Sequence, residues 1–134
     1  MSAPRRLDHG AVVVADEQRS REFYVDGLGL TEVPRPANFD FPGLWAAVGD
    51  QQIHIIGEAE AGRARDVHTG WSPDELARGY ASHLALEVDD LEAYLSRLRD
   101  HGIEVVGGPR DRGDGVQQAY VTDPDGHVIE IMGS

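Results

Sequence analysis

The chain has 134 residues, of which 40% are hydrophobic, so it is long enough for one domain or for two small modules that share a core. It contains no Cys and no Lys, since all 12 basic residues are Arg, which excludes disulfides, cysteine zinc sites, Schiff-base chemistry and a P-loop lysine. The formal net charge of −12 argues against nucleic acids and anionic membranes as partners, because phosphate groups are bound by basic surfaces.

No run of apolar residues approaches the roughly 20 that a transmembrane helix needs. The first six residues, MSAPRR, contain no apolar segment of the signal-peptide type. We therefore expect a soluble, globular, cytoplasmic protein.

The first half of the chain predicts a strand, a helix and three further strands. Asp16 is a typical N-cap, and the helix that follows it ends where Gly27 and Gly29 interrupt the pattern. The segment 34–42 contains three prolines and is expected to be a loop, whereas Gly49-Asp50 is a tight turn between two strands. We expect strands at 7–14, 30–33, 43–48 and 52–56 and a helix at 17–26.

The same order of elements returns in the second half. Asp89 and Asp90 are typical N-caps for a helix whose apolar residues recur at i, i+3, i+4 and i+7, and Gly102 closes that helix. The sequence Asp123-Pro124-Asp125-Gly126 is a turn signal between the last two strands. We expect strands at 82–88, 103–106, 115–121 and 127–131, and apolar helix positions at Leu91, Tyr94, Leu95 and Leu98.

Small and charged residues dominate the segment between the two halves, in which only 72–76 resembles the start of a short helix. We interpret residues 58–80 as a linker between module one, 5–57, and module two, 81–134. This linker is longer than the structureless connections that are usual in compact domains, and it is long enough to cover a site or an interface.

One polar residue interrupts an apolar strand in each half, because His54 and Glu130 each lie between two isoleucines. Alternation along a strand places each of them on the opposite face from these isoleucines. An imidazole or a carboxylate turned into a β-lined interior needs a partner, and a divalent ion accepts both types. We therefore interpret His54 and Glu130 as two ligands of one metal ion.

An internal repeat adds two more candidate ligands. His9 aligns with His83, 74 residues later, and His54 aligns with Glu130, 76 residues later. If the two modules pair about a pseudo-two-fold axis, these four side chains converge on one point. Three neutral imidazoles and one carboxylate would leave a divalent ion with a net charge of about +1, which favours Lewis-acid chemistry. Either Glu130 would then serve both as a ligand and as the base, or metal-bound hydroxide would be the base.

With these features the chain resembles the vicinal oxygen chelate superfamily, which includes glyoxalase I, methylmalonyl-CoA epimerase, extradiol dioxygenases, fosfomycin-resistance enzymes and bleomycin-binding proteins. The segments that support the resemblance are LDH at 7–9, FY at 23–24, GLGL at 27–30, SHLALEVDD at 82–90 and DPDGHVIEI at 123–131. It implies an α+β fold in which two βαβββ modules form a partly open eight-stranded barrel-like sheet around a metal site, usually within a homodimer. It also implies one divalent metal ion, which is Zn, Ni, Co, Mn or Fe(II), with ligand positions at His9, His54, His83 and Glu130.

The subfamilies differ at the position of His54. Glyoxalase I typically has a glutamate there, and no residues of this chain match a glutathione pocket. Extradiol dioxygenases resemble the chain at His9, His83 and Glu130, and they usually leave the His54 position as a non-ligand. The motifs therefore favour a metal site more strongly than they favour one reaction.

Our leading hypothesis is a metal-dependent glyoxalase I-like lyase or isomerase that acts on a small substrate whose adjacent oxygens chelate the metal, with Glu130 as the base. The alternatives are an Fe(II)-dependent extradiol-type dioxygenase and a non-catalytic protein that binds an antibiotic or a metabolite, and fosfomycin modification also stays open. Candidates for a substrate pocket are Arg35, Asn38, Phe41, Trp45, Arg112 and Tyr120.

Overall fold

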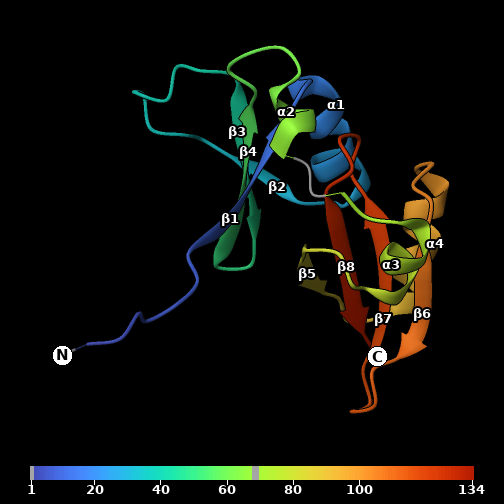
Figure 1. Ribbon diagram of the computed structural model, residues 1–134. Helices are drawn as coiled ribbons and strands as arrows, with labels where there is room; N and C mark the ends of the chain where they lie inside the picture. Colours follow the sequence, from blue (N-terminus) through green and yellow to red (C-terminus); the bar gives the residue numbers. More distant parts are fainter. Residues whose placement is uncertain (1, 68–69) are drawn as a thin grey trace. The chain divides into compact units, whose positions relative to one another are not determined.

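The computed structural model describes residues 2–67 and 70–134, and the chain divides into two compact units. The first unit ends at residue 67 and the second begins at residue 68. Each unit contains a four-stranded mixed sheet with short helices, coloured blue to green in the first unit and yellow-green to red in the second in Figure 1. The predicted α+β class with two βαβββ-like modules is therefore confirmed.

The first unit contains β1 (His9–Val14), α1 (Glu17–Arg21), the π-helical segment η1 (Glu22–Gly27), β2 (Thr31–Val33), β3 (Gly43–Val48), β4 (Gln51–Gly57) and α2 (Arg63–Val67). Its sheet has the order β1-β4-β3-β2, in which β1 runs parallel to β4 and the other neighbours are antiparallel. The predicted helix forms as α1 and continues through η1, and α1 contacts β3 and β4.

The second unit contains α3 (Pro73–Arg78), β5 (His83–Glu87), α4 (Leu91–Asp100), β6 (Gly107–Asp111), β7 (Gln117–Thr122) and β8 (Val128–Gly133). Its sheet repeats the arrangement of the first, with the order β5-β8-β7-β6 and with β5 parallel to β8. The helix α4 packs on β8, and α3 contacts β6.

One face of each sheet forms a hydrophobic core. In the first unit, Val12 and Leu44 are the cross-strand neighbours of Ile55, and all three are buried. Because side chains alternate along a strand, His54 lies on the opposite face of that sheet, and Glu130 does so in the second unit. The buried residues of the second unit's sheet core and of α4 include Leu86, Ala119, Val121, Ile129, Ile131, Leu91, Leu95 and Leu98.

Side-chain caps define where the helices begin, as the sequence predicts. The Asp16 carboxylate accepts hydrogen bonds from the backbone N–H groups of Gln18 and Arg19 at 2.9 and 3.1 Å. The Asp90 carboxylate accepts one from Ala93 at 3.0 Å. Each cap contributes about 1 kcal/mol, which matters for helices this short.

The segment between the two halves contains two short helices. In α3, Ser72 and Glu75 each bond the other's backbone N–H group, which forms the helix start predicted there. The helix α2 was not predicted, because its small and charged residues show no apolar periodicity. The Glu58 carboxylate supports it by accepting two backbone N–H groups near its start. Residues 68 and 69 of the predicted linker lie outside the described residues.

The strand predicted at 103–106 is wrong. The backbone N–H of Ile103 bonds the carbonyl of Leu98 at 2.9 Å and completes the end of α4, whereas the backbone N–H of Val106 bonds the carbonyl of Tyr120 on β7 at 2.8 Å. The strand forms instead as β6, at the edge of the sheet. Pro109 lies within β6. Proline, which has no backbone N–H, is tolerated in an edge strand because one side of that strand has no neighbour to hydrogen-bond.

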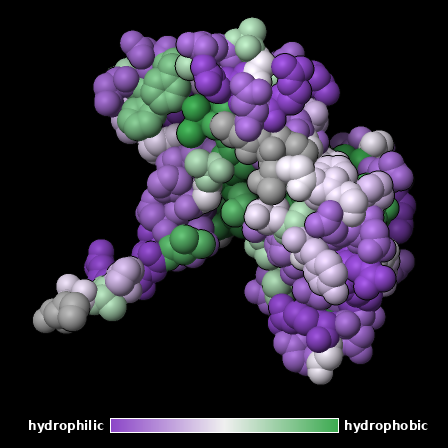
Figure 2. All heavy atoms as spheres, viewed as in Figure 1, coloured by the Kyte–Doolittle hydropathy of each residue, from purple (hydrophilic) through white to green (hydrophobic). Residues whose placement is uncertain are grey.

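Most of the surface shown in Figure 2 is hydrophilic, in keeping with the 27% of charged residues. Within residues 2–67 and 70–134, the exposed large hydrophobic side chains are Leu7, Phe41 and Tyr80. None of the helices in these same ranges is long and apolar enough to span a bilayer. The module boundaries, the eight-stranded barrel and the homodimer stay predictions.

Candidate functional site

In the first unit, His9 and His54 lie on the sheet face opposite the hydrophobic core. His54 on β4 is the cross-strand neighbour of Ala11 on β1 and of Trp45 on β3. His9 begins β1 two residues before Ala11, and residues two apart along a strand share a face. The rings of His9 and His54 are stacked, with centroids 3.9 Å apart and planes inclined by 16°. The structure thus brings together the first predicted ligand pair.

Trp45 extends this stack, so that His54 lies between two rings. The centroids of Trp45 and His54 are 4.0 Å apart and their planes are inclined by 1°. Nε2 of His54 lies 2.8 Å from Oε1 of Gln52, and Nδ1 of His9 lies 2.9 Å from Oδ2 of Asp8. Both partners are acceptors, so these ring nitrogens donate, which leaves Nε2 of His9 as the nitrogen with a free lone pair in the neutral ring.

The surroundings of the stack favour a neutral imidazole beside a charged carboxylate. Burial lowers the pKa of His54, and the neighbouring His9 lowers that pKa further, whereas Asp8 raises it. The pKa of Asp8 is itself lowered, first by the hydrogen bond from His9 and then by the hydrogen bond from Arg6, which is 2.8 Å long. A neutral imidazole is the form that binds metals. It also packs between aromatic rings at a lower desolvation cost than a charged imidazolium.

In the second unit, His83 and Glu130 occupy the equivalent places. Glu130 on β8 is the cross-strand neighbour of Ala85 on β5 and of Tyr120 on β7, and His83 begins β5 two residues before Ala85. Nε2 of His83 lies 3.2 Å from Oε1 of Glu130. Nδ1 of His83 donates to the carbonyl oxygen of Ala81 at 2.7 Å. The Glu130 residue is only 4% exposed, so this second pair is centred on a buried carboxylate.

Neighbouring side chains hold the Glu130 carboxylate in place. The amide of Gln118 donates to its Oε1 at 3.2 Å. Burial raises the pKa of Tyr120, and a hydrogen bond to Glu130 raises that pKa further. The guanidinium of Arg110 lies 5.4 Å from the centroid of the Tyr120 ring and donates to the carbonyl of Ala77 at 2.8 Å. Arg110 therefore connects Tyr120 to the end of α3.

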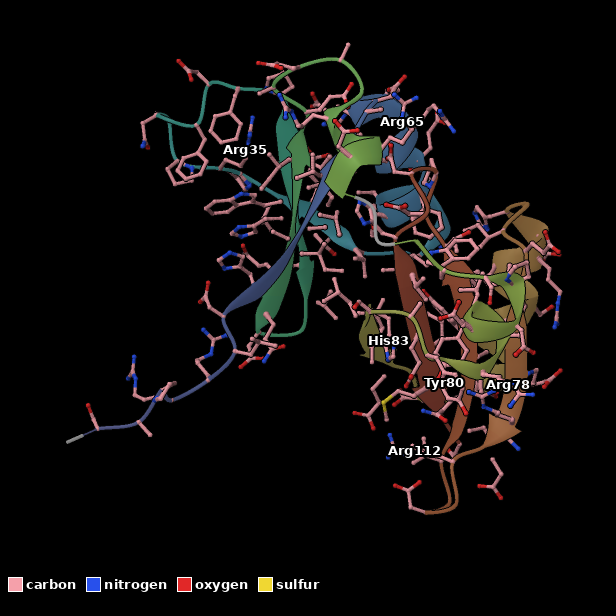
Figure 3. All side chains as sticks on the ribbon, viewed as in Figure 1. Arg35, Arg65, Arg78, Tyr80, His83 and Arg112 are labelled. Atoms are coloured by element: carbon pink, nitrogen blue, oxygen red, sulfur yellow. The ribbon has the colours of Figure 1, made fainter. Side chains whose placement is uncertain are left out.

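Three of the predicted pocket residues come together in the first unit, around Phe39. Arg35, which Figure 3 labels, donates to the carbonyl of Phe41 at 2.7 Å, and its guanidinium lies 5.2 Å from the Phe41 ring centroid. The ring of Phe39 lies 5.2 Å from that of Trp45 and 5.5 Å from that of Phe41. Asn38, by contrast, lies in an exposed turn.

Arg112 follows the end of β6 in the second unit, where Figure 3 labels it. Its Nη2 lies 2.7 Å from Oδ2 of Asp114, and its Nη1 lies 3.8 Å from Sδ of Met132. The hydrogen bond to Asp114 raises the pKa of Arg112 most, and the charges of Glu130 and Glu87 add to it. Met132 lies two residues after Glu130, so Arg112 is at the end of the face that contains Glu130.

Comparison with known proteins identifies the family. The chain matches the model of the Glyoxalase/Bleomycin resistance protein/Dioxygenase superfamily over residues 6–131. The chain belongs to this superfamily. It is 32% identical over 130 residues to lactoylglutathione lyase of Escherichia coli O157:H7, a match that covers 95% of this chain and 91% of the relative. The predicted resemblance to the vicinal oxygen chelate superfamily is therefore confirmed.

Solved structures of the superfamily share this fold while differing in described function. A Bacillus anthracis structure assigned to the glyoxalase family aligns with a TM-score of 0.76 and 27% identity, covering 100% of this chain and 98% of that chain. An antibiotic binding protein from Streptomyces sp. CB03234 aligns with a TM-score of 0.71 and 25% identity, covering 99% and 98%. Membership in the superfamily therefore leaves the substrate and the reaction open.

Superfamily members often bind a divalent metal, and the donor atoms of His83 and Glu130 suit such an ion. Because Nδ1 of His83 donates to a carbonyl, Nε2 presents a lone pair to a carboxylate oxygen, and metal-ligating histidines are typically oriented in this way. His9 is oriented similarly by Asp8. Within each unit, the described residues form no group of three or more His, Asp or Glu placed to hold a metal. The convergence of all four predicted ligands on one ion stays a prediction.

Sequence reasoning missed Gln52, Gln118 and Phe39. Gln52 and Gln118 each lie two residues before a candidate residue on the same strand, so strand alternation was a signal that would have placed them on the site face. Phe39 lies in a loop, where no periodicity predicts the direction of a side chain.

Proposed function

We propose that this chain is a metal-dependent lyase or isomerase of the glyoxalase I type, acting on a small substrate with two adjacent oxygens. The observation that supports it most is the buried Glu130 carboxylate beside Nε2 of His83. The hydrogen bond from Nδ1 of His83 to the carbonyl of Ala81 places the proton of the neutral ring on Nδ1. The 32% identity with a lactoylglutathione lyase supports the reaction type.

His9, His83 and Glu130 are the residues that would hold the ion, since a neighbouring group orients the donor atom of each. When bound, a divalent ion would act as a Lewis acid on the adjacent oxygens of the substrate. These ligands combine two imidazoles with one carboxylate, a set that divalent transition metals accept.

Glu130 is the residue that would move the proton. Its carboxylate would accept a proton from the carbon beside a substrate carbonyl and return it at a neighbouring position. Hydrogen bonds from Gln118 and Tyr120 hold this carboxylate in one orientation. Its burial keeps most of the solvent away from the carboxylate.

Metal analysis of untagged protein tests the site. We expect about one ion per chain in native protein and a much lower content in His83→Ala, because the substitution removes a ligand. His101→Ala is the matched control, since His101 is exposed and its Nδ1 donates to the backbone carbonyl of Arg97 at 2.9 Å. A content well below one ion per chain that His83→Ala leaves unchanged would contradict the proposal.

Deuterium exchange tests the reaction. Metal-loaded protein is incubated in D2O with lactoylglutathione and with a panel of small 2-hydroxycarbonyl compounds, and exchange at the carbon beside the carbonyl is followed by NMR. We expect exchange with at least one compound, and its loss in Glu130→Gln, which keeps the side-chain shape but removes the base. Metal-loaded native protein that exchanges none of them would argue against a lyase or isomerase.

A dioxygenase is the second candidate, and the stacked ring of His54 favours it. If His54 does not bind the ion, the remaining set of His9, His83 and Glu130 is the two-histidine, one-carboxylate set typical of Fe(II) oxygenases. Oxygen uptake with catechols after anaerobic loading with Fe(II) tests this function. Uptake that depends on Glu130 would favour the dioxygenase over the lyase.

A non-catalytic binding protein is the third candidate, favoured by the partly exposed aromatic group around Trp45. Phe39, Phe41 and Trp45 offer ring surface to a planar ligand, and the chain is 25% identical to an antibiotic binding protein. Equilibrium binding of a planar aromatic antibiotic, with and without metal, tests this function. Equal affinity in both forms, with a large loss in Trp45→Ala, would favour it.

A further inference from the structure

We infer that His54 is a positioning residue that supports the ring of His9, and not a metal ligand. The inference rests on the proposed metal site and explains why its ligand set of His9, His83 and Glu130 leaves out His54. Its basis is the stack of three rings formed by His9, His54 and Trp45 on one face of the first sheet.

Two stacked imidazoles do not direct their lone pairs at one ion. A ring nitrogen binds a metal at about 2.0–2.1 Å through a lone pair that lies in the plane of the ring. The rings of His9 and His54 are inclined by only 16° with centroids 3.9 Å apart, so their lone pairs lie in nearly parallel planes. An ion midway between the two rings would lie roughly 2 Å from the plane of each ring. That displacement is almost as long as a metal–nitrogen bond, so neither lone pair would point at the ion. Shared binding would therefore require the stack to open.

Contacts on the second face and at the edge of the His54 ring oppose that opening. Trp45 covers the second face with its centroid 4.0 Å away, and Phe39 packs edge-on against Trp45 at 5.2 Å. At the ring edge, Nε2 of His54 donates to Gln52 at 2.8 Å. Rotation of the His54 ring would disrupt both ring contacts and this hydrogen bond.

The same stack supplies what His9 needs as a ligand. His9 is the first residue of β1 and its side chain is 41% exposed, so little else restrains its ring. His54 supports one face of that ring, and Asp8 binds its Nδ1 at 2.9 Å. Together they define the plane and the rotation of the imidazole while leaving Nε2 available. A ligand oriented in advance loses less freedom when it binds an ion.

Two substitutions separate a supporting ring from a ligand. His54→Phe keeps a flat ring of similar size and removes both nitrogens, whereas His54→Ala removes the ring altogether. The probe is Co(II), whose visible spectrum reports its ligands and whose affinity is measured by competition with a chelator. We expect native affinity and an unchanged spectrum in His54→Phe, and an affinity reduced about 10–100-fold in His54→Ala, the range typical of residues that orient ligands. His9→Ala should weaken binding further.

A second measurement needs no metal. In metal-free protein, the ring protons of His9 should be shielded by the stacked neighbour and should resonate upfield of their usual NMR positions. His54→Phe should keep this shielding, and His54→Ala should remove it.

The outcomes separate this inference from the proposed metal site. A loss of Co(II) affinity in His54→Phe as large as that in His9→Ala, with an altered spectrum, would identify His54 as a ligand and overturn the inference. If native protein binds no Co(II), the proposed metal site fails. The NMR shifts of the His9 ring protons then decide alone whether His54 supports the His9 ring. Retained shielding then supports that role, and unshielded His9 protons in native protein overturn it.

Discussion

Nε2 of His83 lies 3.2 Å from Oε1 of Glu130, although 47 residues separate the two in the chain. Because Nδ1 of His83 donates to Ala81, the facing nitrogen of a neutral imidazole has no proton to offer. Two acceptors held at this distance attract a proton or a cation, because their lone pairs would otherwise face each other. This relationship makes Glu130 the most informative residue to change.

Glu130→Gln should weaken Zn(II) binding roughly 100-fold or more, exceeding the 10–100-fold effects seen when only an orienting partner is lost. The substitution removes the ligand charge while keeping the side-chain shape. Glu87→Gln is the matched control, because Glu87 is exposed on β5, on the same face as His83. Calorimetric titration measures both affinities. Equal affinity in Glu130→Gln and native protein would count against the metal site.

Gly79→Ala should destabilise the second unit through two effects. Gly79 has φ of +78°, a left-handed conformation that an alanine adopts at a cost of about 1–2 kcal/mol. An added Cβ would also collide with the hydroxyl of Tyr120, and overpacking of this kind adds about 1–3 kcal/mol.

Gly102→Ala separates these two effects. Gly102 has φ of +74° and nothing within 4 Å of an added Cβ, so it should show the backbone effect alone. Denaturant unfolding measures both variants, and equal losses of stability would disprove the collision with Tyr120.

Asp123→Ala should lower the free energy of unfolding by about 2 kcal/mol, because it leaves two backbone N–H groups without their acceptor. Asp123 is 4% exposed, and its Oδ1 accepts from Asp125 at 3.0 Å and from His127 at 2.8 Å. Asp123→Asn keeps an acceptor oxygen at this place and should lose clearly less stability in the same unfolding assay. Equal losses would mean that the carboxylate charge, and not the turn hydrogen bonds, is what matters.

The stability of the protein should fall as the pH rises above about 10, partly because of Tyr94. Burial raises the pKa of Tyr94 to about 12. In the unfolded chain a tyrosine ionises near pH 10, so above that pH the unfolded state releases its proton first and becomes favoured. This contribution is fully present below about pH 10 and is lost towards about pH 12. Unfolding measured from pH 8 upward should show a shallower decline in Tyr94→Phe, and an identical decline would refute the assignment.

The internal repeat made the ligand pairs predictable from the sequence. Alternation places residues i and i+2 on the same face of a strand. The parallel neighbouring strand places its own residues of that face beside them. His9 and His54 meet on this basis, and so do His83 and Glu130. Alternation along β7 and its antiparallel pairing with β8 would likewise have placed Gln118 on the face of Glu130, next to Tyr120.

The stack of His54 between two rings could not be predicted in the same way. It depends on the rotamers of His9, His54 and Trp45, which are set by packing across three strands and not by periodicity. A sequence pattern identifies which side chains share a face, but it does not decide whether two imidazoles converge on an ion or stack.

The two errors in secondary structure have local causes. Residues 103–106 have the composition of a strand, but Ile103 is used to end α4, and the strand that follows begins at Gly107 with residues that usually interrupt strands. The helix α2 depends on the carboxylate of Glu58, which lies several residues before it. In both cases a contact outside the segment outweighs its own propensity.

The spacing of equivalent residues describes how the two halves have diverged. Trp45 and Tyr120 occupy matching cross-strand positions 75 residues apart, one more than His9 and His83 and one fewer than the pair formed by His54 and its counterpart. The extra residue between Tyr120 and Glu130 therefore falls in the turn that joins β7 and β8. One residue inserted within β4 would instead turn His54 to the core face. Equivalent positions of the two modules can thus carry imidazole or carboxylate, as at His54 and Glu130, or indole or phenol, as at Trp45 and Tyr120. The backbone keeps the side chain on the same face of the sheet in both modules.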